Sequence, residues 1–230
     1  MLKKLKQGTP EWHNWRRLLI TGTKSDMAPL RGSLPKKAFF KYIASKCCVE
    51  AKDETDIERG HRLEPIAREL MADRLNKIIS DEYVIDGEDG TGLSPDGLIV
   101  TKENPSINDI TEAAEIKCLN NENHLEALYI HRAFRNNKSL YPRSAFLSNV
   151  GVPPAYHIQI YSYFIQLPKL QTLYFGLYNE NMPPAFRLVI ILIKKADVQD
   201  DVDRHAKRLK EMLSEAKSFM NWLEFENALQ

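Results

Sequence analysis

The sequence is poor in the residues and runs that mark several specialised protein classes. Its 230 residues include three cysteines, and Cys47, Cys48 and Cys118 form no pair with the spacing of zinc ligands, so we expect reduced thiols and no structural zinc. No apolar run reaches the roughly 18 residues that span a bilayer. The segment MLKKLKQGTPEW lacks the apolar core of a secretory signal, which makes the cytoplasm the expected location.

Phosphate-loop and histidine motifs are also missing. There is no Gly-rich phosphate loop, which argues against ATP hydrolysis, and the six histidines have no His-x-x-x-His spacing, which argues against a histidine-based site. With 43% hydrophobic and 27% charged residues, the composition is that of an ordinary globular protein. The net charge of +1 neither requires nor excludes nucleic acid, because a binding face depends on clustered charge.

Helical and strand patterns alternate along the chain, and we expect one domain over residues 1–230. Helical patterns cover a stretch starting at Pro10 after a Thr9 cap, then 34–47, 55–75, 123–134, 155–166 and a C-terminal segment around Val202 to Leu223. Strand patterns cover 82–86, 97–100, 113–118, 172–178 and 186–193. This order predicts an α/β protein.

Three local features of these segments lead to further expectations. Thr55 and Glu58 have capping-box spacing, and Pro65 is expected to kink the helix or restart it just after Glu64. The polar stretch 135–149 is expected to be a loop. The apolar stripe of the C-terminal helix is expected to pack on the sheet, with contact to another subunit as the alternative.

The segment AAEIKC carries the first candidate site residues. Strand alternation puts Glu115 and Lys117 on one face, and Asp96 of SPDG precedes them in the chain. Each motif alone has an ordinary explanation: a solvated strand face for the first, and a type I turn for the second. Together, two carboxylates and a lysine are the set that metal-assisted phosphodiester hydrolysis requires, with Asp96 and Glu115 as oxygen ligands of Mg²⁺ and Lys117 beside the attacking water.

These motifs resemble those of the PD-(D/E)XK nuclease superfamily, in which SPDG supplies the aspartate and EIK the E-x-K element. The segments QGTPEWHNWRRLLITGTKSDM, ERGHRLEPIAREL and AYHIQIYSYFI are similar, in family order, to elements of its phage lambda exonuclease branch, the YqaJ-like viral recombinase family. The resemblance implies an α/β restriction-endonuclease-like core, with a central mixed β-sheet flanked by helices.

The resemblance also implies roles for the residues at and near the metals. Asp96 and Glu115 would be metal ligands, the Ile116 carbonyl a further ligand, and Lys117 the catalytic lysine. Glu64 matches the helical acid that lies near the metals in the family. Without the resemblance, a solvated helix charge would be the favoured explanation of Glu64. The implied cofactor is Mg²⁺, in a two-metal site where Mn²⁺ can substitute.

A second set of implied roles concerns DNA and its 5′-phosphate. Arg16 matches the arginine that contacts the 5′-phosphate, a task that suits a planar guanidinium. Thr23 stands where the family often has serine, and Ser94 matches a position before the aspartate. Gln159 and Tyr163 have Q-x-x-x-Y spacing, which puts them one helical turn apart on one face.

The implied activity is 5′-to-3′ exonuclease digestion of linear double-stranded DNA, in the cytoplasm of a bacterial host of a phage or prophage. The implied partners are DNA ends, two further copies of the chain in a homotrimer, and a single-strand annealing protein. Two alternatives stay open: an endonuclease of the same fold, and a module that binds DNA ends without cleaving them. The segment 101–112 is either a substrate-contacting hairpin or an exposed turn.

Overall fold

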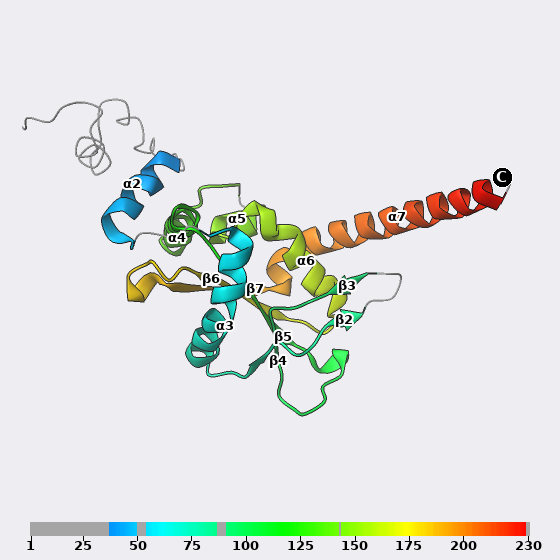
Figure 1. Ribbon diagram of the computed structural model, residues 1–230, viewed down its shortest axis with the longest axis horizontal. Helices are drawn as coiled ribbons and strands as arrows, with labels where there is room; N and C mark the ends of the chain where they lie inside the picture. The colour runs from blue at the N-terminus through cyan, green and yellow to red at the C-terminus, as the bar shows by residue number, and fades with distance from the viewer. Residues whose placement is uncertain (1–36, 50–53, 87–90, 143, 229–230) are drawn as a thin grey trace, which may run out of the picture. The chain divides into compact units, whose positions relative to one another are not determined.

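The computed structural model describes residues 37–49, 54–86, 91–142 and 144–228 (Figure 1). These residues form two compact units. The first unit comprises the described residues up to Asn76, with Ile116–Pro154 and Phe175–Ile191. The second comprises Lys77–Glu115, Ala155–Tyr174 and the described residues from Leu192 onward. The expectation of a single domain stays a prediction.

A five-stranded sheet has the strand order β1-β4-β5-β6-β7. Its strands are β1 (Ile79–Ser80), β4 (Gly97–Ile99), β5 (Glu112–Cys118), β6 (Thr172–Tyr178) and β7 (Leu188–Lys194). β1 pairs antiparallel with β4, and β4 pairs antiparallel with β5. β5 and β6 run parallel, because the Gln171 amide donates to the Thr111 carbonyl at their start and the Leu119 amide donates to the Tyr178 carbonyl at their end. The sheet is therefore mixed, and the predicted α/β class is confirmed.

The predicted strands are recovered with changes at their ends. The segment 172–178 forms β6 over its full length, whereas 82–86 contributes only β2 (Ile85–Asp86), which pairs with β3 (Gly92–Leu93) in a separate two-stranded sheet. The sequence analysis missed β1 and β3, because a two-residue strand is too short to show alternation. β7 begins two residues later than predicted, after the 3-10 turn η5 (Pro184–Phe186).

In the first unit, helix α3 (Asp56–Leu75) shows how the sequence defines an element's ends. The Thr55 hydroxyl accepts a hydrogen bond from the Glu58 amide in the predicted capping box, and Asn76 ends the helix in the left-handed conformation. The helix is continuous through Pro65, so the predicted restart after Glu64 is wrong. Its buried face of Leu63, Ala67 and Met71 offsets the hydrogen bond that the proline removes.

The other helices of the first unit are α2 (Lys37–Cys47), α4 (Asn121–Arg135) and α5 (Phe146–Val150). Figure 1 shows α2 beside α4, where the ring of Phe40 lies 5.9 Å from that of Tyr129. Helix α5 occupies the end of the segment 135–149 that was predicted to be a loop. That prediction was wrong for residues 146–149, because burial of Leu147 and Val150 stabilises a helix too short to be recognised from its pattern.

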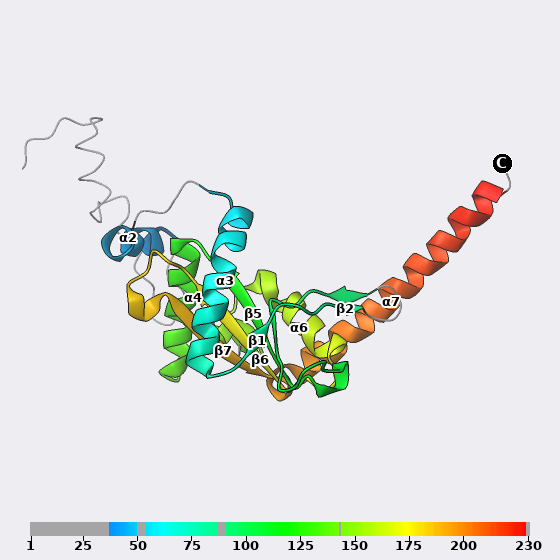
Figure 2. The same cartoon turned by 60° about the horizontal axis from the view of Figure 1, so that its bottom comes forward.

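The second unit contains η3 (Ile107–Asp109), helix α6 (His157–Gln166), preceded by η4 (Pro154–Tyr156), and helix α7 (Lys195–Ala228). The start of α7 packs against α6 and buries Val198 and Val202, while the rest of the helix extends away from α6 in Figures 1 and 2. Along the predicted apolar stripe, Val202 is buried, Leu209 and Leu213 are half-buried, and Ala216 is exposed. Burial of the stripe therefore decreases along the part of α7 whose side chains the structure describes. Within the described ranges, no helix combines the length and the apolar character that a membrane span needs.

Candidate active site

Asp96 and Glu115 lie on neighbouring strands of the second unit. In the antiparallel pair of β4 and β5, Gly97 is opposite Ala114 and Leu98 is opposite Ala113. Continuing this register by one residue places Asp96 opposite Glu115. Asp96 is half-buried just before β4, and Glu115 is 0% exposed in the middle of β5. The structure therefore brings together the two carboxylates that the sequence predicted as a pair.

Tyr163 of helix α6 joins these two positions. Its hydroxyl donates a short hydrogen bond to Oε2 of Glu115, and it accepts one from the backbone amide of Asp96 at 3.2 Å. The Ala114 carbonyl lies 3.3 Å from the same hydroxyl. Tyr163 is itself 0% exposed, so the contact is inside the unit and not on its surface. The buried hydroxyl of Tyr163 therefore connects Glu115, in the middle of β5, with Asp96, the residue just before β4.

The pKa of the Tyr163 hydroxyl shows that both carboxylates act on one point. Burial raises this pKa well above its ordinary value, and the negative charges of Glu115 and of Asp96 raise it further. Tyr163 therefore keeps its proton at any physiological pH and stays a hydrogen-bond donor to Glu115. Two carboxylates whose charges act on the same buried hydroxyl form a centre of negative potential, which favours a cation.

Two other predicted residues of the second unit lie close in sequence to Asp96 and Tyr163. Ser94 is exposed, two residues before Asp96. Gln159 is half-buried on α6, one helical turn before Tyr163, as the Q-x-x-x-Y spacing predicts. The two residues of that motif have different surroundings, since only Tyr163 is fully buried. The spacing alone could not distinguish them.

Three predicted residues belong to the first unit. Ile116 is buried and Lys117 is half-buried, and both follow Glu115 directly along β5. Glu64 of α3 forms an ion pair with Arg68 at 2.5 Å, one helical turn further on. The sequence analysis missed this pair, although its i, i+4 spacing was visible. Arg16 and Thr23, the predicted 5′-phosphate contacts, lie outside the described residues.

The donor atoms of the carboxylate pair suit a hard divalent cation. Carboxylate oxygens are preferred ligands of Mg²⁺, which also keeps several water molecules and so needs few protein ligands. In the ranges that the structure describes, no group of three or more His, Cys, Asp or Glu side chains is arranged to hold a metal. A metal at Asp96 and Glu115 would therefore complete its coordination with backbone carbonyls, water or substrate oxygens.

Gly97 of SPDG has a packing role that the turn interpretation did not include. It is the first residue of β4, and a Cβ atom built there would collide with Cγ2 of Ile79 on β1. Only glycine allows the two strands to approach this closely. The SPDG motif therefore allows close packing of β4 against β1, in addition to forming the turn that contains Asp96.

The buried histidine of helix α4, His124, has a structural role. His124 of α4 is 1% exposed, and its Nε2 lies 2.8 Å from the Phe186 carbonyl. Burial lowers the pKa of His124, and the contact with the carbonyl only partly opposes this effect. The ring is neutral at physiological pH and connects α4 to η5.

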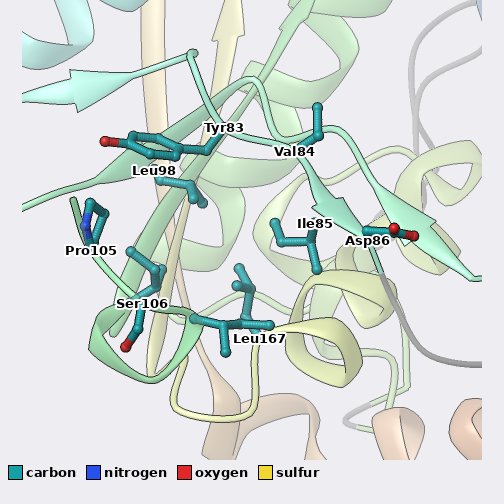
Figure 3. A pocket seen from close by; sticks show the side chains of 10 residues that line it. Tyr83, Val84, Ile85, Asp86, Leu98, Pro105, Ser106 and Leu167 are labelled. Carbon is teal, nitrogen blue, oxygen red and sulfur yellow. The ribbon is translucent and has the colours of Figure 1, made fainter.

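A cavity of about 280 Å³ lies in the second unit, beside β4 and the 3-10 turn η3 (Figure 3). Leu98, two residues after Asp96, forms part of its wall with Ile85, Ile110 and Leu167. Its polar side chains are Tyr83, Asp86 and Ser106, and the described residues that line it include no lysine or arginine. The cavity is therefore unsuited to a phosphate group and suited to an apolar one. Ile107 of the segment 101–112 lines it, which gives that segment a structural role whether or not it contacts substrate.

Comparisons with known proteins place these observations in a family. Residues 11–165 match the model of the YqaJ-like viral recombinase domain, which is more than half of the chain. No curated protein matches the sequence. Among solved structures, the chain is similar to the alkaline exonuclease LHK-Exo from Laribacter hongkongensis, with 18% identity, coverage of 95% of this chain and 89% of that one, and a TM-score of 0.45. It is also similar to LHK-Exo in complex with dAMP, with 20% identity, coverage of 81% and 83%, and a TM-score of 0.46.

Proposed function

The chain belongs to the YqaJ-like viral recombinase family, and on this premise we propose that it is a metal-dependent 5′-to-3′ exonuclease. It degrades one strand of linear double-stranded DNA and leaves a 3′ single strand for phage-type recombination by annealing. The observation that supports this proposal best is the pair of Asp96 and Glu115, joined by the buried hydroxyl of Tyr163. The proposed setting is the cytoplasm of a bacterial host.

The proposed metal ligands are Asp96 and Glu115, with the Ile116 carbonyl and Glu64 as further ligands from the family pattern. A bound Mg²⁺ would act as a Lewis acid on the scissile phosphate and on the attacking water. The fit rests on the donor chemistry of two carboxylates at opposite positions of neighbouring strands, since carboxylate oxygens are preferred ligands of Mg²⁺. A second metal ion, or Mn²⁺ in place of Mg²⁺, belongs to the same proposal.

Lys117 has a separate task in this proposal. Its ammonium group would donate a hydrogen bond to the attacking water and stabilise the negative charge that develops there. It therefore orients the nucleophile but does not hold the metal. A lysine on the strand that carries a ligand can do this without moving, because strand residues keep a fixed orientation.

Tyr163 acts as a positioning residue. Its position differs from that expected of a DNA contact, since its hydroxyl is buried against Glu115 and the Asp96 amide. By donating to Oε2 of Glu115, it limits the orientations that this carboxylate can take. Gln159, which is half-buried on the same helix, keeps its proposed role at the DNA.

The DNA end would be recognised by Arg16, with Thr23 and Ser94 as further phosphate contacts. A terminal phosphate carries more negative charge than an internal one, so a guanidinium can select phosphorylated 5′ ends. If this contact also aligns the scissile bond, it contributes to the rate as well as to affinity. Recognition and chemistry would then depend on different residues, and mutations can separate them.

One assay distinguishes the proposal from its two alternatives. Purified protein is incubated with Mg²⁺ and linear duplex DNA labelled at the 5′ or the 3′ end, and a covalently closed circle serves as the control. The proposal expects early release of the 5′ label as mononucleotide, late release of the 3′ label, and an intact circle. Cleavage of the circle would favour an endonuclease, and binding of linear ends without any release of label would favour a binding module.

The proposed assembly is a homotrimer that encloses DNA and works with a single-strand annealing protein. This part of the proposal rests on the family alone. Light scattering should give about three times the mass of 26.5 kDa. A monomer at all concentrations would contradict the trimer without affecting the proposed chemistry, because Asp96, Glu115 and Tyr163 come from one chain.

A further inference from the structure

The sulfur atoms of two adjacent cysteines lie close to that of a methionine distant in the sequence, all within the first unit. Cys47 is the last residue of α2 and Cys48 follows it, and their Sγ atoms are 3.7 Å apart. The Sγ of Cys48 lies 3.6 Å from the Sδ of Met182, which is 134 residues away along the chain. Cys47 is exposed, Cys48 is half-buried and Met182 is only 2% exposed. The cluster therefore has a buried base and an opening to solvent.

The backbone around the cluster holds these sulfur atoms in place. The Cys48 amide donates to the Ala44 carbonyl at 2.9 Å, which continues the helical turn beyond α2. The Val49 amide donates to the Asn181 carbonyl at 3.0 Å, directly before Met182. On the other side, Nε of Arg187 donates to the Met182 carbonyl at 3.1 Å. Both sulfur-bearing segments are therefore fixed by hydrogen bonds of their own.

We propose that Cys47, Cys48 and Met182 form a binding site for a soft monovalent metal cation, Cu⁺. Two thiolates and a thioether are soft ligands, and this set favours Cu⁺ over hard cations such as Mg²⁺. Zn²⁺ is a poorer match, since structural zinc sites use four Cys or His ligands and no thioether. The site is distinct in chemistry from the carboxylate pair and does not depend on the proposed nuclease activity.

The distances from Cys48 Sγ to the other two sulfur atoms are close to those of a three-coordinate site. A metal–thiolate bond of about 2.3 Å puts the sulfur atoms of a planar trigonal site about 4.0 Å apart. The two sulfur–sulfur distances of 3.6 and 3.7 Å are a few tenths of an ångström shorter. A small rotation of exposed Cys47 and of the flexible methionine side chain would open the cluster to this size, and methionine tolerates such adjustment well.

The surroundings of Cys48 determine how metal binding would depend on pH. Burial raises the pKa of the Cys48 thiol to about 12, and its contact with Cys47 and the negative charges of Cys47 and Glu122 add to this effect. Cys48 thus keeps its proton at neutral pH until a metal displaces it. Binding breaks two S–H bonds, forms two Cu–thiolate bonds and releases two protons to solvent, so affinity should rise with pH.

Binding of Cu⁺ would connect the end of α2 with the segment that contains Met182. A ligand that binds only the folded protein raises its stability in proportion to the logarithm of ligand concentration. The first unit should therefore unfold at a higher temperature when Cu⁺ is present. This effect provides a measurement that does not depend on nuclease activity.

The test uses the full chain, reduced and kept without oxygen, with Cu⁺ supplied as its bicinchoninate complex. Loss of the absorbance of that complex should show transfer of one Cu⁺ per chain, and X-ray absorption at the copper edge should show three sulfur ligands. Cys47→Ser and Cys48→Ser should each weaken binding by more than about 10²-fold, and Met182→Leu by about 10-fold. Met182→Leu keeps the side-chain volume, so it serves if a cysteine variant fails to fold.

Two matched variants complete the test. Cys118→Ser removes a thiol outside the cluster, and Met212→Leu removes an exposed thioether of α7, so both should bind Cu⁺ as the wild type does. No transfer from bicinchoninate to the wild type would overturn the proposal. An equal loss of binding in Cys118→Ser and Cys47→Ser would also overturn it, and so would two sulfur ligands with full affinity in Met182→Leu.

Discussion

Strand β5 carries two glutamates in contrasting environments, one at its start and one in its middle. Glu112, at the start, accepts hydrogen bonds from Lys77 Nζ and from the Tyr174 hydroxyl, both at 2.7 Å. Glu115, three residues later, accepts a hydrogen bond from Tyr163 and lies on the strand position opposite Asp96. Each glutamate has a tyrosine donor. They differ in the neighbouring charge, which is a cation for Glu112 and a second carboxylate for Glu115.

This difference separates a structural carboxylate from a proposed catalytic one. Burial alone would raise the pKa of Glu112. The pKa is nevertheless lowered, because Lys77 and Tyr174 donate hydrogen bonds to the charged carboxylate. The chain itself thus supplies a compensating charge at Glu112. Glu115 lies opposite Asp96, and the proposed metal cation would bind to these two carboxylates. The predictions below test this contrast, beginning with the largest expected effect.

The largest effect is expected for the paired carboxylates. Asp96→Ala or Glu115→Gln should lower the cleavage rate by more than about 10³-fold, because each removes a proposed metal ligand. EDTA should have the same effect on the wild type. Release of label from end-labelled DNA measures the rate, and Glu112→Gln is the matched control, with a rate near that of the wild type. An equal loss in Glu112→Gln and Glu115→Gln would remove the distinction between the two glutamates.

Lys117→Ala should lower the cleavage rate on the order of 10²-fold while metal binding persists, because its proposed task is to orient water. Calorimetric titration with Mg²⁺ measures binding separately from the rate. A variant that no longer binds Mg²⁺ would give Lys117 a structural role at the site in place of the proposed one.

Arg16→Ala should lower the rate on 5′-phosphorylated DNA by about 10-fold or more and reduce the preference over 5′-hydroxyl ends, since a lost charged hydrogen bond costs about 1.5–3 kcal/mol. Lys117→Ala should slow both substrates and keep their ratio. Paired assays of the two end types give that ratio. If Arg16→Ala keeps the full preference, another group reads the phosphate, with Thr23 and Lys24 as the next residues to change.

Tyr163→Phe should raise the Mg²⁺ concentration for half-maximal activity by about 10-fold, because it frees Glu115 from its hydroxyl donor. The ring remains in place, so the fold should persist. Tyr174→Phe removes the corresponding donor of Glu112 and should leave the Mg²⁺ requirement unchanged. Similar Mg²⁺ curves for both variants would argue against a positioning role for Tyr163.

The smallest effect is expected for the ion pair of Lys77 and Glu112, at the start of β5. Lys77→Met should lower the free energy of unfolding by about 1 kcal/mol at neutral pH, without changing the cleavage rate. The pKa of Glu112 is lowered by folding, so this contribution is present above its ordinary value of 4.5 and is lost as pH falls through the lower folded pKa. Urea unfolding at pH 7 and pH 3 should therefore show a smaller difference between wild type and Lys77→Met at pH 3 than at pH 7.

Several elements could be predicted because their signals are local. The capping box of Thr55 and Glu58 defined the start of α3, and the β-branched and aromatic residues of 172–178 defined β6. The short elements β1, β3 and α5 could not be predicted, since they depend on pairing or burial by distant residues. The restart predicted after Glu64 is wrong for a similar reason, because the buried face of α3 offsets the local cost of Pro65.

The sequence alone was sufficient to predict the chemical types at the site: two carboxylates nineteen residues apart, a lysine beside one of them, and a helix with Gln159 and Tyr163. The types of residue at a site can be read directly from short sequence motifs and from their resemblance to a family. Only the tertiary structure decided that the Tyr163 hydroxyl is buried between Glu115 and Asp96, that Glu112 has Lys77 as its cation, and that Met182 contacts Cys48. Burial and contacts between distant residues arise from packing, and packing sets the charge state and ligand preference of each group.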